Sequence, residues 1–166
     1  MHRLFSLVTA WLVALPASAM ALGQIPAGKV ENLHGKEVSF PAAFSGTPSL
    51  AILLFEHGQQ DVANDTIALL EQAQEKQSTL TWVEFPLIGE PPIFVRFMIR
   101  DGMRDVISSA RQHNVFPLFT EKDAWRSKAD VGKGTEPLLA KLGHDGAILK
   151  TRPLDQFNTV KDILAY

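Results

Sequence analysis

A group of polar side chains that could carry acid–base chemistry follows an apolar run near the middle of the chain. The run 49–55 reads SLAILLF, and the residues after it are Glu56-His57-Gly58-Gln59-Gln60-Asp61. Because histidine titrates near neutral pH, His57 beside Glu56 or Asp61 could transfer a proton or ligate a metal ion. The end of a parallel strand is also a common ligand site. The alternative is a solvated loop without chemistry, which we favour because position in a fold is not evidence of function.

Other reactive side chains are scarce. The chain has no cysteine, which removes disulfide bonds, thiol nucleophiles and thiolate metal ligands. Its five histidines show neither H-x-x-x-H nor H-x-H spacing, so the sequence predicts no metal site and no cofactor. A long-range pair of His57 and Glu136 across the fold stays open. No G-x-S-x-G motif occurs, and the G-K-G-T stretch at 132–135 lacks phosphate-loop spacing, so we name no catalytic residue.

A basic stripe is the second candidate site. Arg96, Arg100 and Arg104 recur every four residues within 93–113, a segment in which apolar residues recur at helical spacing. On a helix these arginines would share one face and could bind an acidic partner or a lipid phosphate. Because aspartates interrupt the stripe, we favour the alternative of an exposed helix face with internal ion pairs.

The same predicted helix carries large apolar side chains, among them Phe94, Phe97 and Met98. We expect these side chains to belong to the core, because an amphipathic helix normally buries its apolar stripe. If the helix packs loosely, they instead form a docking surface for another molecule. The pattern alone leaves both interpretations of this helix open.

Length and composition indicate one ordinary globular domain. The chain has 166 residues, of which 46% are hydrophobic and 20% charged. Single domains typically have about 100–200 residues. With 16 Lys+Arg against 18 Asp+Glu, the formal net charge is −2, so no basic excess indicates binding to nucleic acid.

The N-terminal segment 1–19 has the pattern of a secretory signal peptide. A positive start, Met1-His2-Arg3, precedes the apolar run 4–15, and Ala17-Ser18-Ala19 supplies small residues for cleavage. The apolar run is shorter than the about 20 residues that a membrane-spanning helix needs. We therefore predict cleavage after Ala19 or Ala21, a flexible segment at 20–29, and a periplasmic or secreted protein without a stable membrane span. An uncleaved N-terminal membrane anchor is the alternative.

The rest of the chain alternates between strand and helix patterns. A hairpin at 30–40 turns at His34-Gly35, where glycine can adopt positive φ. Strands are predicted at 49–55, 78–85, 115–120, 137–140 and 147–151, and helices at 61–76, at 93–113, from Asp123 and from Asp155. Asp61 could cap the first of these helices. Parallel βαβ connections followed by an antiparallel hairpin predict a mixed sheet with helices on both faces.

This order of elements resembles the thioredoxin-like fold over most of residues 30–166. Val30–Phe55 is similar to the opening of redoxins, and the family's Pro–strand–turn–strand signature is matched by Thr135-Glu136-Pro137-Leu138-Leu139 and Asp145-Gly146-Ala147-Ile148. The resemblance implies an α/β three-layer sandwich with a mixed central sheet, and a cis Glu136–Pro137 peptide facing the active-site bend. The family's C-x-x-C motif would fall in 56–61, where the chain has no thiolate to attack a disulfide or a peroxide.

A narrower resemblance concerns Phe97–Arg104 and Leu118–Arg126, which look like cysteine-poor thioredoxin-like assembly factors of the ATP synthase membrane sector. This resemblance implies an assembly or chaperone-like role.

We therefore predict an exported, redox-inactive protein of a bacterial envelope that acts by binding a protein or peptide, without nucleic acid or cofactor. A scaffold that has lost its nucleophile keeps a groove beside Pro137 and an exposed strand edge, which suit an extended chain. The predicted binding residues are Glu56, His57, Gln60, Asp61, Pro137, Arg96, Arg100 and Arg104. The alternative is a non-thiol enzyme or a metal-dependent site built on Glu56, His57 and Asp61.

Overall fold

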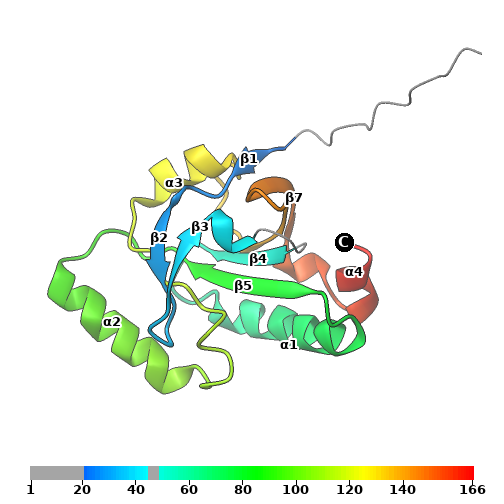
Figure 1. Ribbon diagram of the computed structural model, residues 1–166, viewed down its shortest axis with the longest axis horizontal. Coiled ribbons are helices and arrows are strands. Elements are labelled where there is room, and N and C mark those ends of the chain that lie inside the picture. Colours follow the sequence, from blue (N-terminus) through cyan, green and yellow to red (C-terminus); the bar gives the residue numbers. More distant parts are fainter. Residues whose placement is uncertain (1–20, 45–48) are drawn as a thin grey trace, which may run out of the picture.

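The computed structural model describes residues 21–44 and 49–166, whose path Figure 1 shows. The predicted signal peptide at 1–19 lies outside these residues. The strands are β1 (Gly23–Gln24), β2 (Gly28–Glu31), β3 (Glu37–Phe40), β4 (Ser49–Leu54), β5 (Thr81–Pro86), β6 (Leu138–Leu142) and β7 (Ala147–Pro153). The helices are α1 (Gln60–Lys76), α2 (Ile93–Val106), α3 (Lys122–Ala129) and α4 (Val160–Leu164), with short 3-10 turns at Ala42–Phe44 and Leu154–Gln156. No helix in the two described ranges combines the length and hydropathy needed to cross a bilayer.

The central sheet is mixed, with the strand order β1-β7-β6-β4-β5. Strand β4 pairs in parallel with β5 and antiparallel with β6. All six residues of β4 are buried, because both faces of the sheet are covered. The predicted strand at 115–120 does not form as a regular strand. Its residues meet β5 and the following loop in isolated parallel bridges at Val115 and Leu118.

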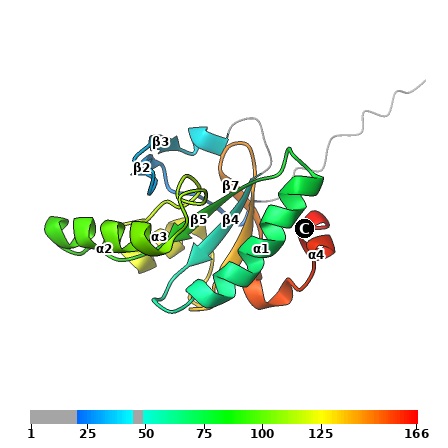
Figure 2. The ribbon, with the colours of Figure 1, turned by 90° about the horizontal axis from the view of Figure 1, so that it is seen from below.

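Two hydrophobic clusters lie on opposite faces of this sheet. Figure 2 shows α1 and α4 on one side of the sheet and the β2–β3 hairpin on the other. On one face, Ile67 and Leu70 of α1 pack with Ile163 of α4. On the other face, Trp125 of α3 packs with Phe40 of the β2–β3 hairpin. The structure therefore confirms the predicted α/β three-layer sandwich with a mixed central sheet and helices on both faces.

The predicted N-terminal hairpin forms as a separate two-stranded sheet of β2 and β3. Gly35 in its turn has a φ of +87°, a conformation that glycine adopts without a steric penalty. Asn32 fixes the turn, because its Oδ1 accepts a hydrogen bond of 2.8 Å from the Lys36 amide. Its Nδ2 donates to the carbonyl of His113 at 2.9 Å, so the hairpin is also tied to the segment that follows α2.

Two helices begin differently from the prediction. The N-cap of α1 is Gln59, and Asp61 lies inside the first turn instead of capping the helix. Helix α3 begins before Asp123, because the carboxylate of Glu121 accepts the amides of Asp123 and Ala124. The backbone N–H groups at this end thereby gain an acceptor and hold the pKa of Glu121 below its usual value.

Helix α2 is shorter than the predicted 93–113. Ile107 adopts an extended conformation and packs with Leu33 and Val115, so burying this side chain ends the helix after Val106. The last helix also starts later than the predicted Asp155, because Thr159 provides a capping box with Asp162.

The peptide before Pro137 differs from the prediction made by resemblance. Among the described residues the cis bond is Phe40–Pro41, and the Glu136–Pro137 bond is trans, so the predicted cis isomer is wrong. The position of Pro137 agrees better with the prediction. It directly precedes β6, whose Leu138 pairs with Leu53 near the carboxyl end of β4.

Candidate functional site

The outward side of α2 exposes large apolar side chains. Ile93, Phe94, Phe97 and Met98 are 70%, 65%, 62% and 69% exposed, and we call these four residues the α2 outer face. No residue of α2 is buried. The prediction that Phe94, Phe97 and Met98 belong to the core is therefore wrong, and the alternative of an exposed apolar face describes the helix.

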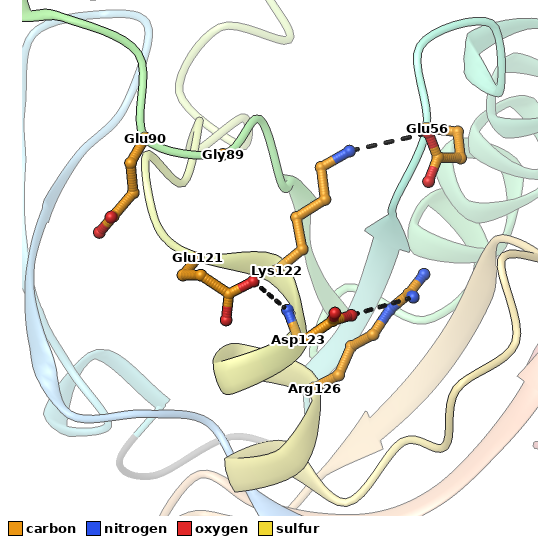
Figure 3. Close-up of a pocket in the computed structure, with 7 residues that line it drawn as sticks. All are labelled: Glu56, Gly89, Glu90, Glu121, Lys122, Asp123 and Arg126. Carbon is orange, nitrogen blue, oxygen red and sulfur yellow. Dashed lines mark hydrogen bonds and ion pairs between the residues drawn. The ribbon is translucent and has the colours of Figure 1, made fainter.

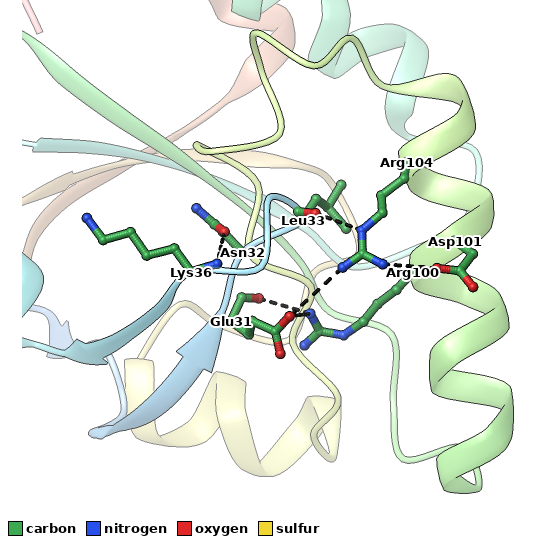
Figure 4. Close-up of polar contacts among 7 residues, drawn as sticks. All are labelled: Glu31, Asn32, Leu33, Lys36, Arg100, Asp101 and Arg104. Carbon is green, nitrogen blue, oxygen red and sulfur yellow. Dashed lines mark hydrogen bonds and ion pairs between the residues drawn. The ribbon is translucent and has the colours of Figure 1, made fainter.

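Helix α2 is oriented this way because its inward side has its own contacts. Met103 packs against the small cluster of Leu33, Ile107 and Val115. Arg104 Nε donates a hydrogen bond of 2.7 Å to the carbonyl of Leu33 in the hairpin turn. A hydrogen bond from a charged donor is among the stronger ones, and this one holds α2 against the hairpin turn. Figure 4 shows α2 beside the hairpin, with the side chain of Arg104 reaching toward Leu33.

Glu31 extends the contact between α2 and the hairpin. Arg100 Nη1 donates to the Glu31 carbonyl at 3.3 Å and lies 3.6 Å from its carboxylate. Arg104 lies 3.9 Å from the same carboxylate and 2.9 Å from Asp101 (Figure 4). The expected ion pairs are therefore present. The side chains of Arg100 and Arg104 are 15% and 36% exposed, so these two arginines lie against the hairpin with Arg104 partly open to solvent.

Arg96 completes the inward stripe. Its Nε donates to the Pro91 carbonyl at 2.8 Å, and the guanidinium groups of Arg96 and Arg100 lie 5.6 and 5.4 Å from the centre of the Phe119 ring. Cations at such distances from an aromatic face are attracted to it. Binding of an external acidic partner by these arginines stays a prediction, and it would require them to exchange these internal contacts.

The polar segment after β4 does not assemble an acid–base site. Glu56, His57 and Asp61 are exposed. Glu56 forms an ion pair of 3.8 Å with Lys122, and His57 makes no hydrogen bond or ion pair with any described residue, including Glu136. Among residues 21–44 and 49–166 no group of His, Asp and Glu is arranged to hold a metal ion.

Gln59, which the sequence analysis did not select, organises this bend. Its Oε1 accepts hydrogen bonds from the amides of Phe55 and Glu56 at 2.7 and 3.1 Å. Its Nε2 donates to the carbonyl of Thr135, which ties the bend to the segment before Pro137. A glutamine amide can donate and accept at once, but nothing in the local sequence indicates this partner 76 residues away.

Gln60 turns inward to a buried carboxylate on β5. Glu84 is fully buried, lies 3.3 Å from Arg111, and accepts a hydrogen bond of 3.2 Å from Gln60 Nε2. Burial raises the pKa of Glu84 above its usual value, although Arg111 and Gln60 act in the opposite direction. This placement gives Gln60 a structural role between α1 and β5.

A pocket of about 370 Å³ lies at the carboxyl end of β4 (Figure 3). Its charged residues are Lys122 and Arg126 together with four acids, Glu56, Glu90, Glu121 and Asp123. Arg126 stacks on the Phe55 ring at 4.0 Å, and Lys122 donates to the Phe55 carbonyl. The lining of this pocket is therefore mostly charged, and most of its charged groups are acidic.

Comparison with known proteins supports the fold. No family model matches the sequence, and no curated protein matches it. BsSco, a member of the Sco family of cytochrome c oxidase assembly proteins, is similar in structure with a TM-score of 0.58 at 14% identity over 86% of this chain and 90% of that one. The exposed lipoprotein thioredoxin Etrx1 from Streptococcus pneumoniae gives 0.56 at 14% identity, with 84% and 96% covered.

A third structure agrees with these two. The thiol-disulfide oxidoreductase from Bacteroides fragilis has a TM-score of 0.54 at 14% identity, covering 86% of this chain and 97% of that one. At such identities the likeness concerns the fold alone. Disulfide exchange requires a thiolate, and this chain has no cysteine to supply one. The chain therefore has a thioredoxin-like fold, without the thiols on which disulfide exchange depends.

Proposed function

We propose that this chain is an exported, non-redox protein that binds another protein through the α2 outer face. The observation that supports the proposal is the exposure of 62–70% of four large apolar residues on one side of a helix. With roughly 200 Å² for a large apolar residue, this amounts to about 500 Å² of apolar surface. Patches of that size on single domains often mark interaction sites.

The orientation of α2 strengthens the proposal. A surface helix normally turns its apolar side inward, because burying apolar area is favourable by about 25 cal/mol per Å². Here Arg100 and Arg104 occupy the inward side and bind the hairpin through backbone carbonyls. A partner that covered the outer face would gain the burial that the fold itself does not provide.

Binding at the bend and Pro137, through Glu56, His57, Gln60, Asp61 and Pro137, has less support. The adjoining pocket is lined by charged groups, most of them acidic, and Gln60 is engaged with Glu84. An acid–base or metal-dependent activity has no geometric support from His57, which is exposed and forms no ion pair with a carboxylate of the described residues. We therefore place partner binding on α2.

Export and an assembly role are the remaining parts of the proposal. The signal-peptide pattern at 1–19 supports export, and so does the likeness to Etrx1, which is described as an exposed lipoprotein. The likeness to BsSco, from a family of assembly proteins, is consistent with an assembly or chaperone-like role for the bound complex. Cell fractionation followed by N-terminal sequencing tests export, with Met20 or Leu22 expected as the first residue.

The binding proposal is tested by capture from envelope extract with the full chain carrying a C-terminal tag. We expect the wild type to retain a specific protein that the double variant Phe94→Ser, Phe97→Ser does not retain. Val62→Ser is the matched control, because Val62 is a 40% exposed apolar residue on α1. Equal capture by the wild type and the double variant would contradict the proposal, and so would equal loss in the control.

A further inference from the structure

The α2 outer face continues into an acidic surface. Asp101 and Asp105 follow Phe97 and Met98 on the exposed side of the helix, at helical spacings of three and four residues. Asp101 pairs with Arg104, but Asp105 and the exposed Glu90 before the helix form no ion pair with any described residue. Arg100 and Arg104 contact the hairpin, and Arg96 contacts Pro91 and Phe119. The exposed side of α2 therefore has large apolar residues in its N-terminal half and aspartates in its C-terminal half.

We propose that the occupant of this surface is a cationic amphipathic segment of another protein. Its apolar side chains would contact Phe94, Phe97 and Met98, and its Lys or Arg residues would lie against Asp105 and Glu90. The inference rests on the proposed function, since it identifies the partner of the same surface. With a rise of 1.5 Å per residue, Ile93 and Asp105 of α2 are about 18 Å apart along the helix axis, which a helical partner of about four turns can span.

Charge argues against a second copy of this chain. If two outer faces met in parallel, Asp101 and Asp105 of both copies would face each other, and like charges in contact are unfavourable. If they met antiparallel, the carboxylates would be buried against Phe94 and Phe97, and burying an unpaired charge is more costly still. The net charge of −2 adds a small repulsion in both arrangements.

Charge also argues against a membrane surface. Interfacial helices that bind anionic lipids carry Lys and Arg beside their apolar face. Here the acidic residues on the helix and before it are Glu90, Asp101 and Asp105. Arg100 and Arg104 are engaged with the hairpin, and Arg96 is engaged with Pro91 and Phe119. A cationic protein segment is the occupant whose apolar and charged parts both match this surface.

Two designed helical peptides of about 18 residues test the inference on the full chain. They share one apolar stripe, and their flanking residues are all Lys in one peptide and all Glu in the other. We expect fluorescence anisotropy to show about tenfold tighter binding of the Lys peptide, with the preference decreasing as salt is added. The double variant Glu90→Lys, Asp105→Lys should reverse the preference, and Phe94→Ser, Phe97→Ser should weaken the binding of both peptides.

The outcomes separate this inference from the proposed function. Three results would overturn the inference of a cationic partner: equal affinity for the two peptides, no binding of either peptide, or an unchanged preference in the lysine variant. A dimer in sedimentation that the serine variant abolishes would assign the face to a second copy. Flotation of the wild type with anionic vesicles would assign it to a membrane. If envelope capture still depends on Phe94 and Phe97 while the peptides show no preference, the proposed function stands and the cationic partner is refuted. If capture does not depend on Phe94 and Phe97, the proposed function itself is refuted.

Discussion

Replacing both phenylalanines of the α2 outer face by serine should leave the fold almost unchanged. Phe94 and Phe97 are 65% and 62% exposed, which is close to what a solvent-facing position on a helix allows. Phenylalanine and serine also have similar helix propensities. We therefore expect the free energy of unfolding of Phe94→Ser, Phe97→Ser to differ from that of the wild type by less than about 1 kcal/mol.

A core position provides the contrast. Phe85 on β5 is fully buried and packs with the rings of Phe40 and Phe116, which also contact each other. Replacing a buried phenylalanine by alanine costs about 3–5 kcal/mol, because apolar contacts are lost and a cavity remains. Phe85→Ala should therefore show a much lower urea midpoint than the double serine variant.

Urea denaturation followed by circular dichroism measures all three proteins under one set of conditions. A loss of more than about 3 kcal/mol in Phe94→Ser, Phe97→Ser would refute the orientation of α2 described above, because a loss of that size requires buried rings. A small loss with an unchanged denaturant slope would support it.

Three further predictions concern groups outside the outer face. Burial raises the pKa of Glu84 above its usual value. The free energy of unfolding should therefore be higher at low pH, where this carboxyl is protonated, and should fall as the pH rises through the native pKa. Glu84→Gln should remove this dependence in urea titrations from about pH 4 to 8. Arg104→Ala removes the hydrogen bond to the Leu33 carbonyl, so hydrogen exchange should become faster in α2 and in the hairpin turn, and unchanged exchange would argue against this contact. His57→Ala should change neither stability nor partner capture, and loss of capture would favour the bend at 56–61 as the binding site.

Much of the fold could be predicted from local patterns. The run at 49–55 is apolar on both faces and is bounded by turns, which is typical of a central strand, and it forms β4. Gly35 marks the hairpin turn because a tight turn there needs positive φ. Such features depend on neighbours in the sequence.

The orientation of α2 could not be predicted in the same way. The helix has apolar side chains on both sides, with Ile99 and Met103 on one and Phe94 and Phe97 on the other. The choice between them depends on Arg104 reaching the carbonyl of Leu33, which is 71 residues away in the sequence. Thr135, the partner of Gln59, is 76 residues away, and burial of Ile107 ends α2 earlier than its helical pattern indicates.

The prediction made from the family signature was also only partly correct. Pro137 lies before β6 as the resemblance implied, but its peptide bond is trans. The charged pocket beside the bend likewise has residues from segments that no local motif connects, such as Glu90 from the loop before α2 and Asp123 from α3. A resemblance can therefore place a proline correctly in the fold while its peptide isomer and the charges around it depend on side chains that are distant in sequence.

Site-specific photo-crosslinking in envelope extract tests the central claim most directly. A benzophenone side chain is placed at position 97 on α2, at position 57 in the bend, or at position 62 on α1, each in the full chain. We predict one discrete protein adduct from position 97 and none from the other two positions. An adduct that forms from position 57 and not from position 97 would contradict the assignment of partner binding to α2.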